Sequence, residues 1–215
     1  MFFLLTIEDK ILLDPSKFRD LIKNNQSQNY PKKYNDVVYL LLRDKYISKI
    51  ILDQGIVVSI KSFKIKSDLI VEIEGVIDIK YECILLMFCP KEGEILYGKI
   101  TESEHSEITI DCDLIKVKVS NQQLMNPCFF NTKEKLWFWS FEGKNYYYEK
   151  NQKCRLKVIY VNFKSKKELA KMINNKTSND AEEDDENKEK IQREDIMEIY
   201  CSMGEEGLGP VGWWE

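Results

Sequence analysis

The sequence predicts an α+β amino-terminal domain followed by an all-β barrel. Three observations support this fold class. Residues 1–90 combine strand-like alternation with two stretches of helical periodicity. Residues 91–215 carry a series of short strand-like segments at the close spacing that is typical of small barrels. The chain has 215 residues, and at roughly 100–200 residues per domain this length is enough for two small domains.

The first domain is expected to open with a strand and continue with two helices. The strand is predicted over Phe2–Leu13. An aspartate-proline pair ending at Pro15 then supplies a helix N-cap and a first-turn proline, and Phe18 begins the apolar stripe of an amphipathic helix. A second helix is expected over residues 34–51, with Gly55 marking its end.

Strands complete the first domain and make up the second. In the first domain they are predicted at residues 56–65, 69–73, 76–81 and 83–88. A turn-rich Cys-Pro-Lys-Glu-Gly cluster then marks the boundary near residue 90. In the second domain strands are predicted at residues 94–101, 107–112, 114–120, 136–141, 145–149, 154–163 and 196–202. Residues 164–195 begin basic and end acidic with few large apolar side chains, so we expect them to be a mobile insertion.

The charge of the chain is unevenly distributed. With 32 basic and 36 acidic residues the net charge is −4, which excludes a strongly basic, histone-like nucleic-acid binder. Residues 180–195 hold nine acidic and three basic residues, a net charge of −6, so the remainder carries +2. The ordered part of the chain is therefore expected to be mildly basic.

The sequence lacks the residues that several kinds of binding and catalytic site require. Glycines do not form a phosphate-binding loop, and the single histidine, His105, sits in a polar stretch that is expected to be a surface turn. The six cysteines include no C-x-x-C pair, so no metal site or cofactor is expected. The amino terminus lacks the pattern of a signal peptide and no apolar run is long enough to span a membrane, which favours a reducing, intracellular location. An enzyme that uses cysteines or the acidic run stays only a formal alternative.

Aromatic and basic residues in the second domain favour RNA binding. Nine aromatic residues fall between Phe129 and Tyr148, and on alternating strands some of them should face outward. Exposed aromatic rings flanked by basic side chains form the usual platform for single-stranded nucleic acid. The residues that we expect to contact RNA are Lys99, Lys116, Lys118, Trp137, Trp139, Arg155 and Lys157. The alternative is that the aromatic rings fill the core and the lysines form an ordinary solvated face.

Four segments resemble one family. They are MFFLLTIEDKILLDPSKF, with Leu12, Pro15 and Phe18; DKYISKIILDQG, which ends at Gly55; FCPKEGEILYGKI at the domain junction; and the closing GLGPVGWWE. In these segments the sequence resembles the larger stalk subunits of eukaryotic RNA polymerase III, a family with relatives in the stalk of archaeal RNA polymerase. The Gly-Leu-Gly turn followed by two tryptophans distinguishes the polymerase III form from its polymerase II counterpart.

The resemblance implies a non-catalytic nuclear subunit. It implies an amino-terminal tip domain that docks on the polymerase core through Phe2, Pro15, Phe18 and Gly55, and a carboxy-terminal OB fold that contacts nascent RNA during transcription initiation. It also implies a heterodimer with the smaller, helical stalk subunit. Trp213 and Trp214 are expected to close the barrel or to pack at the heterodimer interface. The alternative function is a free-standing OB-fold protein that binds single-stranded RNA in translation or RNA processing.

Overall fold

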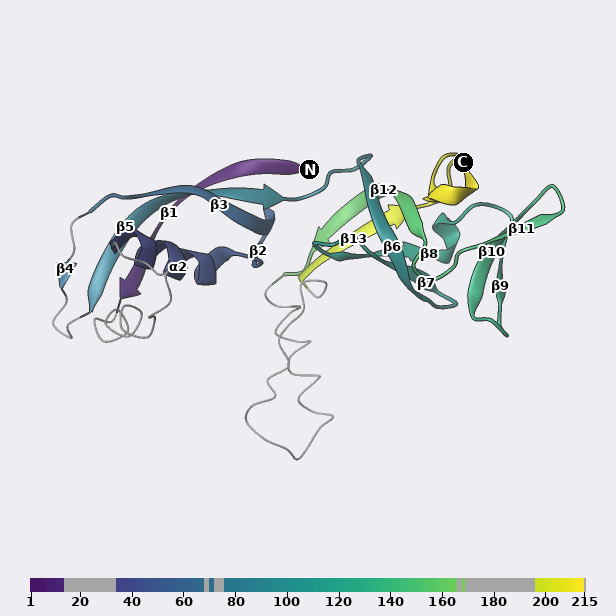
Figure 1. The fold of residues 1–215 in the computed structure, drawn as a ribbon, viewed down its shortest axis with the longest axis horizontal. Helices are drawn as coiled ribbons and strands as arrows, with labels where there is room; N and C mark the ends of the chain where they lie inside the picture. The colour runs from purple at the N-terminus through teal and green to yellow at the C-terminus, as the bar shows by residue number, and fades with distance from the viewer. Residues whose placement is uncertain (14–33, 68–69, 72–75, 166–167, 169–195, 215) are drawn as a thin grey trace, which may run out of the picture. The chain divides into compact units, whose positions relative to one another are not determined.

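The computed structural model describes residues 1–13, 34–67, 70–71, 76–165, 168 and 196–214. The chain divides into two compact units, Met1–Cys89 and Pro90–Glu215, which are described separately below (Figure 1). The helix expected around Pro15 and Phe18 lies outside the described residues, as does most of the insertion expected at 164–195. No helix in the described part of the chain has the length and apolar character needed to cross a membrane.

The first unit is built on an antiparallel sheet. Its strands follow the order β1-β5-β3-β2, and β4 pairs with the start of β5. The bounds are β1 Phe2–Leu13, β2 Ile50–Ile51, β3 Gly55–Ile65, β4 Ile70–Val71 and β5 Ile77–Phe88. β1 pairs with β5 along its entire length, from Phe2 opposite Phe88 to Leu13 opposite Ile77. β5 is thus one continuous strand where the sequence predicted two, because its alternation persists through Glu82.

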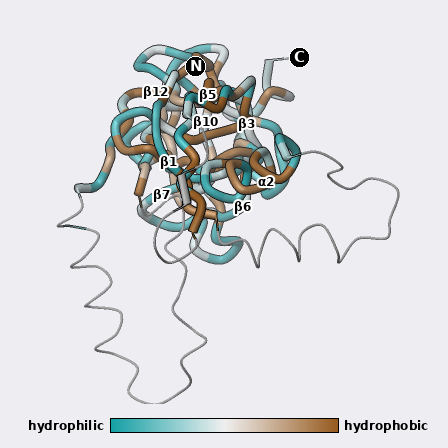
Figure 2. Tube along the Cα trace, turned by 90° about the vertical axis from the view of Figure 1, so that its left-hand side faces the viewer, coloured by the Kyte–Doolittle hydropathy of each residue, from teal (hydrophilic) through white to brown (hydrophobic). Residues whose placement is uncertain are grey.

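One helix, α2 (Tyr34–Tyr46), packs against this sheet. Its buried residues Val38 and Leu42 share a hydrophobic core with Leu13, Tyr81 and other side chains of the strands. The coil of α2 alternates between hydrophobic and hydrophilic residues in Figure 2, as expected for a helix with one buried face. The α+β character of the first unit is thereby confirmed.

The predicted end of this helix was wrong by several residues. The sequence suggested a helix through residue 51, because the apolar pattern continues beyond Tyr46. Instead Ile50–Ile51 forms the short strand β2, in which Ile51 lies opposite Gly55. Gly55 itself has φ +103°, and a Cβ there would approach the carbonyl oxygen of Phe88 to 2.3 Å. Only glycine fits this backbone.

The second unit contains a closed five-stranded barrel. Its strands are β6 (Ile95–Ser103), β7 (Glu107–Asp111), β8 (Lys116–Ser120), β12 (Lys153–Phe163) and β13 (Met197–Ser202). β6, β7 and β8 form an antiparallel meander, β13 runs parallel to β8, and β12 closes the ring by pairing with both β13 and β6. This topology is that of an OB fold, so the predicted fold class is confirmed.

Alternation along the barrel strands separates an apolar interior from a polar exterior. In β8, Val117 and Val119 are fully buried, whereas Lys116 is exposed and Lys118 half-buried. In β12, Leu156 and Val158 are buried between more exposed basic residues. Isoleucines of β6 and β7 complete the interior from the other side, namely Ile100, Ile108 and Ile110. The lysines of β8 thus lie on the outside of the barrel and its valines on the inside.

A separate three-stranded sheet is inserted between β8 and β12. It consists of β9 (Cys128–Asn131), β10 (Leu136–Phe141) and β11 (Lys144–Tyr147), in the order β11-β10-β9. The sequence predicted β10 with its correct bounds but assigned it to the barrel, and it missed β9. A short turn, η1 (Asn121–Gln123), leads into this inserted sheet.

The chain ends beside the barrel. β14 (Gly209–Pro210) pairs with β12, where Pro210 lies opposite Cys154, and the 3-10 turn η2 (Val211–Trp213) follows. β14 is too short to leave an alternating pattern, so the sequence did not predict it.

Candidate nucleic-acid interface

A row of charged side chains crosses four strands on the outside of the barrel. The strand register places Lys153 of β12 opposite Lys99 of β6, Lys99 opposite Asp111 of β7, and Asp111 opposite Lys116 of β8. The three lysines are exposed. We call these four residues the basic row. The row brings together two of the lysines predicted from the sequence and adds Lys153, which was missed.

Arg155 lies on β12 two residues beyond the row. Its Nη1 donates a hydrogen bond to the carbonyl oxygen of Gly207 (3.2 Å), and its guanidinium carbon lies 5.7 Å from the ring centroid of Tyr97. Tyr97 is 61% exposed. The guanidinium is stacked on this exposed tyrosine, and its Nε is buried without a hydrogen-bond partner among the described residues. The alternation of β6 could have indicated Tyr97, but only the register brings it beside Arg155.

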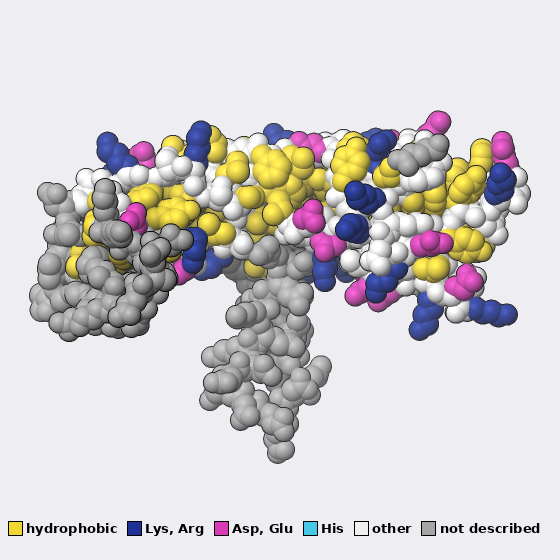
Figure 3. Space-filling model, viewed as in Figure 1, with side chains coloured by type: hydrophobic (Ala, Val, Ile, Leu, Met, Phe, Trp, Pro, Cys, Tyr) yellow, Lys and Arg dark blue, Asp and Glu magenta, His cyan; other side chains and the backbone are white. Residues whose placement is uncertain are grey.

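Two other predicted lysines are already paired with carboxylates. The Nζ of Lys118 donates to Glu107 Oε1 at 2.7 Å, and the Nζ of Lys157 donates to both carboxylate oxygens of Glu205, at 2.7 and 2.9 Å. The hydrogen bond from Lys118 to Glu107 raises the pKa of its ammonium group. A phosphate would have to compete with these carboxylates, so both lysines are weaker candidates for RNA contact. Figure 3 shows the same interleaving of basic and acidic side chains over the second unit.

Both tryptophans predicted to contact RNA are buried in the inserted sheet. Trp137 is 7% and Trp139 8% exposed. The Nε1 of Trp137 donates to the carbonyl oxygen of Glu104 (2.7 Å), and the Nε1 of Trp139 donates to that of Asn126 (3.3 Å). Both rings are therefore buried where they fix the inserted sheet against its neighbours, and neither lies on an open face.

The outer face of the inserted sheet carries three other rings. Phe138 lies directly opposite Phe129 on one side and Tyr147 on the other. The ring centroids are 5.7 and 5.4 Å apart. Phe129 is exposed and the other two rings are half-buried. The sequence shows nine aromatic residues in this region but not which of them face outward, because that depends on the sheet to which they belong.

The carboxy-terminal tryptophans pack onto the inner face of the inserted sheet. The Trp213 ring contacts those of Tyr148, Trp139 and Tyr146, at centroid distances of 4.7, 5.7 and 5.8 Å. The Nε1 of Trp214 donates to the carbonyl oxygen of Leu208 (2.8 Å). Both rings thus join the tail to the body of the second unit.

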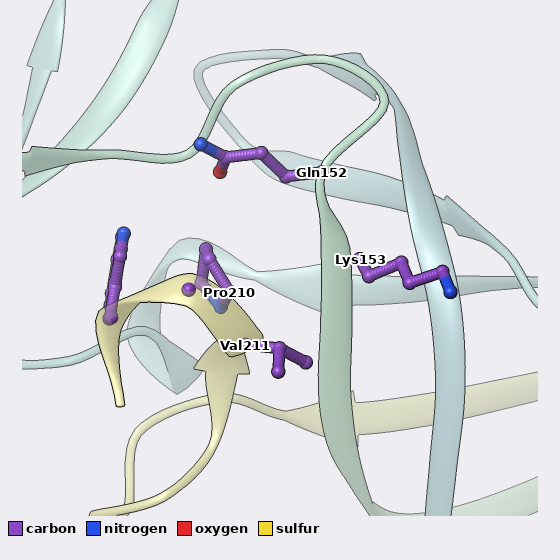
Figure 4. Close-up of a pocket in the computed structure, with 6 residues that line it drawn as sticks. Gln152, Lys153, Pro210 and Val211 are labelled. Atoms are coloured by element: carbon purple, nitrogen blue, oxygen red, sulfur yellow. The ribbon is translucent and has the colours of Figure 1, made fainter. Parts of the chain in front are cut away.

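A hollow of about 340 Å³ opens beside this tail (Figure 4). Its lining residues come from the start of β12 and the residue before it, from β14 and from η2: Gln152, Lys153, Pro210, Val211, Gly212 and Trp213. In Figure 4 Gln152 and Lys153 extend to opposite sides of the β12 backbone. Gln152 is held by Glu149, whose N–H donates to Gln152 Oε1 (3.0 Å).

The first unit carries an exposed apolar strip on one face of its sheet. Alternate residues of β1 point to this face, and Phe2 and Leu4 are about half exposed. Leu86 of β5 is opposite Leu4, and the ring of Phe2 lies 5.2 Å from that of Phe88. Phe2 is thus exposed on the surface of the first unit. The position of Gly55 is explained by its backbone conformation, whereas Pro15 and Phe18 lie outside the described residues.

A polar network on the first unit connects helix and sheet. The Nζ of Lys45 donates to Asp9 Oδ2 (2.8 Å) and to the hydroxyl oxygen of Tyr81 (3.0 Å), and the Tyr46 hydroxyl donates to the same Asp9 oxygen (2.8 Å). The hydrogen bond from Lys45 is the largest cause that lowers the pKa of Asp9 to about 2. Burial raises the pKa of the Tyr46 hydroxyl far above its usual value. These groups are paired among themselves and form a structural clasp.

The cysteines do not assemble into a reactive site. All six are free thiols. Burial raises the pKa of Cys112, Cys154 and Cys201 to about 12 in each case, which disfavours the nucleophilic thiolate. Within the described residues, no three His, Cys, Asp or Glu side chains gather in a way that could hold a metal ion.

Comparison with known proteins identifies relatives of the whole chain. A family model described as RNA polymerase III subunit Rpc25 matches residues 94–214. DNA-directed RNA polymerase III subunit rpc8 of Dictyostelium discoideum is 26% identical over 227 residues, which cover 100% of this chain and 85% of the relative. Subunit RPC8 of Saccharomyces cerevisiae is 24% identical over 234 residues and 100% of both chains. Subunit RPC8 of Bos taurus is 22% identical over 223 residues, 100% of this chain and 98% of the relative.

The family match and the fold agree. The matched residues begin just before β6 and include the barrel, the inserted sheet and both terminal tryptophans. They make up more than half of the chain, and the three relatives align with all of it. The protein therefore belongs to the RNA polymerase III subunit Rpc25 family.

Proposed function

We propose that this chain is the larger stalk subunit of a nuclear RNA polymerase III, that it acts in transcription initiation, and that it contacts nascent RNA through its barrel. Family membership supports the place in the polymerase and a role without catalysis of its own. The basic row supports the contact with RNA, because it sets three exposed lysines against one aspartate on the outside of an OB barrel. Arg155 adds a guanidinium beside the row.

The first unit supplies the surface that would meet other subunits. Phe2 and Leu4 are both exposed at alternate positions of β1, and neighbouring exposed apolar side chains favour protein–protein contact. We assign this exposed apolar strip to docking on the polymerase core. The smaller, helical stalk subunit is the proposed heterodimer partner.

Affinity purification tests the place in the polymerase. We expect a tagged full-length chain, expressed in its own cells, to recover the other polymerase III subunits in stoichiometric amounts. Replacing Phe2 and Leu4 together with Ser should reduce this recovery, while replacing the exposed Phe129 of the second unit with Ser should not. Recovery of the chain without polymerase subunits would contradict the assignment and favour a free-standing RNA-binding protein.

Binding of single-stranded RNA over a series of salt concentrations tests the RNA contact. Each phosphate contact contributes about 0.7 to the slope of log affinity against log salt for single strands. Lys99→Ala and Lys116→Ala should each flatten the slope of the full chain by up to about this amount. Lys118→Ala should change the slope less than Lys99→Ala does, because Lys118 is paired with Glu107.

Lys133→Ala is the matched control for charge. Lys133 is an exposed lysine on the turn between β9 and β10, outside the basic row. Equal slopes for the wild type and for the Lys99 and Lys116 variants would overturn the assignment of this face. If Lys133→Ala flattened the slope by a similar amount, the RNA would be attracted by the overall charge of the chain and not bound along the basic row.

A further inference from the structure

The hollow beside the carboxy terminus has a rigid aromatic wall. Trp213 lines it, and the ring of Trp213 is itself held by Tyr148 at 4.7 Å and by Trp139 at 5.7 Å between centroids. An indole that is fixed before binding loses little conformational freedom when another ring stacks on it. The volume of about 340 Å³ lies at the low end of the ~300–1,000 Å³ range of small-molecule sites. It therefore suits one planar ring system rather than an extended ligand.

Two positive charges lie side by side on β12 and β6, next to the hollow. Lys153 and Lys99 are directly opposite each other in the register of β12 and β6. Neither ammonium group forms an ion pair with a residue in the described part of the chain. Like charges directly opposite on neighbouring strands are destabilising. The one carboxylate of the basic row, Asp111, lies opposite Lys99 on its other side and leaves Lys153 without an acidic neighbour in the row. A bound anion would relieve the remaining repulsion, so the pair is a second indication of an anionic ligand.

Lys153 connects the two features. It lines the hollow, and it is also the first member of the basic row. In Figure 4 its side chain extends away from Gln152 and across the neighbouring strand. A ligand with its ring in the hollow would therefore place an attached anionic group over β12 and β6. A nucleotide has these two parts, because a sugar joins its planar base to a phosphate.

We propose that the hollow binds one unstacked base of single-stranded RNA against Trp213, while the adjoining phosphate lies between Lys99 and Lys153. This inference rests on the proposed contact with RNA and names a defined subsite for it. Stacking on one aromatic side chain and a contact with basic residues together form the usual mode of single-strand binding.

The site should tolerate any base. Gln152 is the one side-chain amide in its lining, and both ends of this amide are engaged by Glu149. The subsite therefore presents the face of an indole and few free groups for the edge of a base. Stacking of this kind is sequence-tolerant, because every base has a π-face.

Gly212 offers a way to fill the hollow without disturbing the fold. It lines the hollow, and a Cβ at this position would have no atom within 4 Å. We expect Gly212→Leu to occupy the space of the base and Gly212→Ala to leave most of that space open. Lys153→Ala removes the phosphate contact, and Lys133→Ala again serves as the control for charge.

The test compares two RNAs of about ten nucleotides, within the ~4–16 nucleotides covered by one OB fold. One is an ordinary single strand, and the other has the same backbone without bases. One stacked base is worth ~1–3 kcal/mol, which converts to roughly 5- to 150-fold in affinity. Gly212→Leu should weaken binding of the ordinary RNA to the full chain by a factor in this range and leave binding of the abasic RNA unchanged. Lys153→Ala should weaken binding of both.

Each outcome separates the subsite from the wider function. If Gly212→Leu binds ordinary RNA as the wild type does while Lys99→Ala weakens it, the RNA contact stands and the subsite is overturned. If the wild type binds neither RNA, both are overturned, while recovery of the polymerase still tests membership in the complex. A glutamate-rich peptide is the competing ligand. If it displaces RNA from the wild type, binds more tightly than RNA does and its own binding is weakened by Gly212→Leu, the occupant of the hollow is an acidic protein segment and the proposal fails.

Discussion

The indole of Trp213 packs edge-on against the phenol ring of Tyr148, with 4.7 Å between the two ring centroids. Tyr148 is fully buried, and its hydroxyl oxygen accepts a hydrogen bond from the N–H of Met125 (3.3 Å). The last residues of the chain are thus packed on a side chain that is tied to the loop before β9. This arrangement makes the tail part of the folded second unit.

Trp213→Ala should therefore destabilise the protein. A fully buried tryptophan costs about 3–5 kcal/mol when it is truncated to alanine, and for the half-buried Trp213 we expect about 2–4 kcal/mol. The free energy of unfolding from urea titration measures this loss. Phe129→Ala, which removes a 52% exposed ring, is the control and should cost less than about 1 kcal/mol. Equal losses for the two variants would show that the tail contributes no specific packing.

Gly98 of β6 allows this strand to approach the end of β7 closely. A Cβ at this position would lie 2.6 Å from both the carbonyl oxygen of Asp111 and the Cγ2 of Ile110, and 2.7 Å from the sulfur of Cys112. Gly98→Ala should force the barrel apart locally and cost about 1–3 kcal/mol in the free energy of unfolding. Gly212→Ala meets no atom and should stay within about 0.5 kcal/mol of the wild type. A stable Gly98→Ala variant would mean that β6 and β7 can separate without loss.

The sequence predicted the bounds of individual strands better than it predicted how the strands pair into sheets. Alternation predicted β1 and β10 with their correct bounds, because period-two burial is a local property of the chain. Alternation does not say which strands pair, so β10 was assigned to the barrel rather than to its own sheet. The helix was extended too far for a similar reason, since Ile50 and Ile51 are apolar in either structure.

The candidate site shows the same division between local and long-range information. Outward-facing lysines on β8 and β12 followed from the pattern of their own strands. The opposition of Lys99 and Lys153 depends on the register between β6 and β12, which are more than fifty residues apart in the chain. The pairing of Lys118 with Glu107 and of Lys157 with Glu205 is equally a product of the fold. For this reason the basic residues could be identified from the sequence, but not which of them are paired with carboxylates and so less available to a phosphate.

The buried thiols should react only after the protein opens. Burial raises the pKa of Cys154 and of Cys201 to about 12, so at pH 8 almost none of either thiol is ionised in the folded state. We expect a thiol reagent such as dithiobis(nitrobenzoate) to modify these two residues at the rate of unfolding, and all six cysteines at once in concentrated urea. Cys154→Ala should lower the total by one thiol and leave the fast phase of the native protein unchanged. A smaller fast phase in this variant would contradict the buried position of Cys154.

The clasp between Asp9 and Lys45 should make the free energy of unfolding depend on pH in the acidic range. The hydrogen bond from Lys45 lowers the pKa of Asp9 from 3.8 to about 2 in the folded state. Folding therefore favours the ionised carboxylate. Its contribution is fully present above the unfolded pKa near 4 and is lost as the pH falls through about 2. Because the Asp9 side chain is 44% exposed, solvent screening should reduce the effect to about 1 kcal/mol or less.

Urea titrations between pH 5 and pH 2 would measure this contribution, with Asp9→Asn as the variant. The variant should be less stable than the wild type at pH 5, and the difference should shrink as the pH falls towards 2, because the wild-type carboxylate then becomes progressively protonated. Asp44→Asn is the control, since Asp44 is an exposed carboxylate that interacts only with the neighbouring Arg43 among the described residues. A constant gap between wild type and Asp9→Asn across this range would mean that the hydrogen bonds of Asp9, and not its charge, hold α2 to β1.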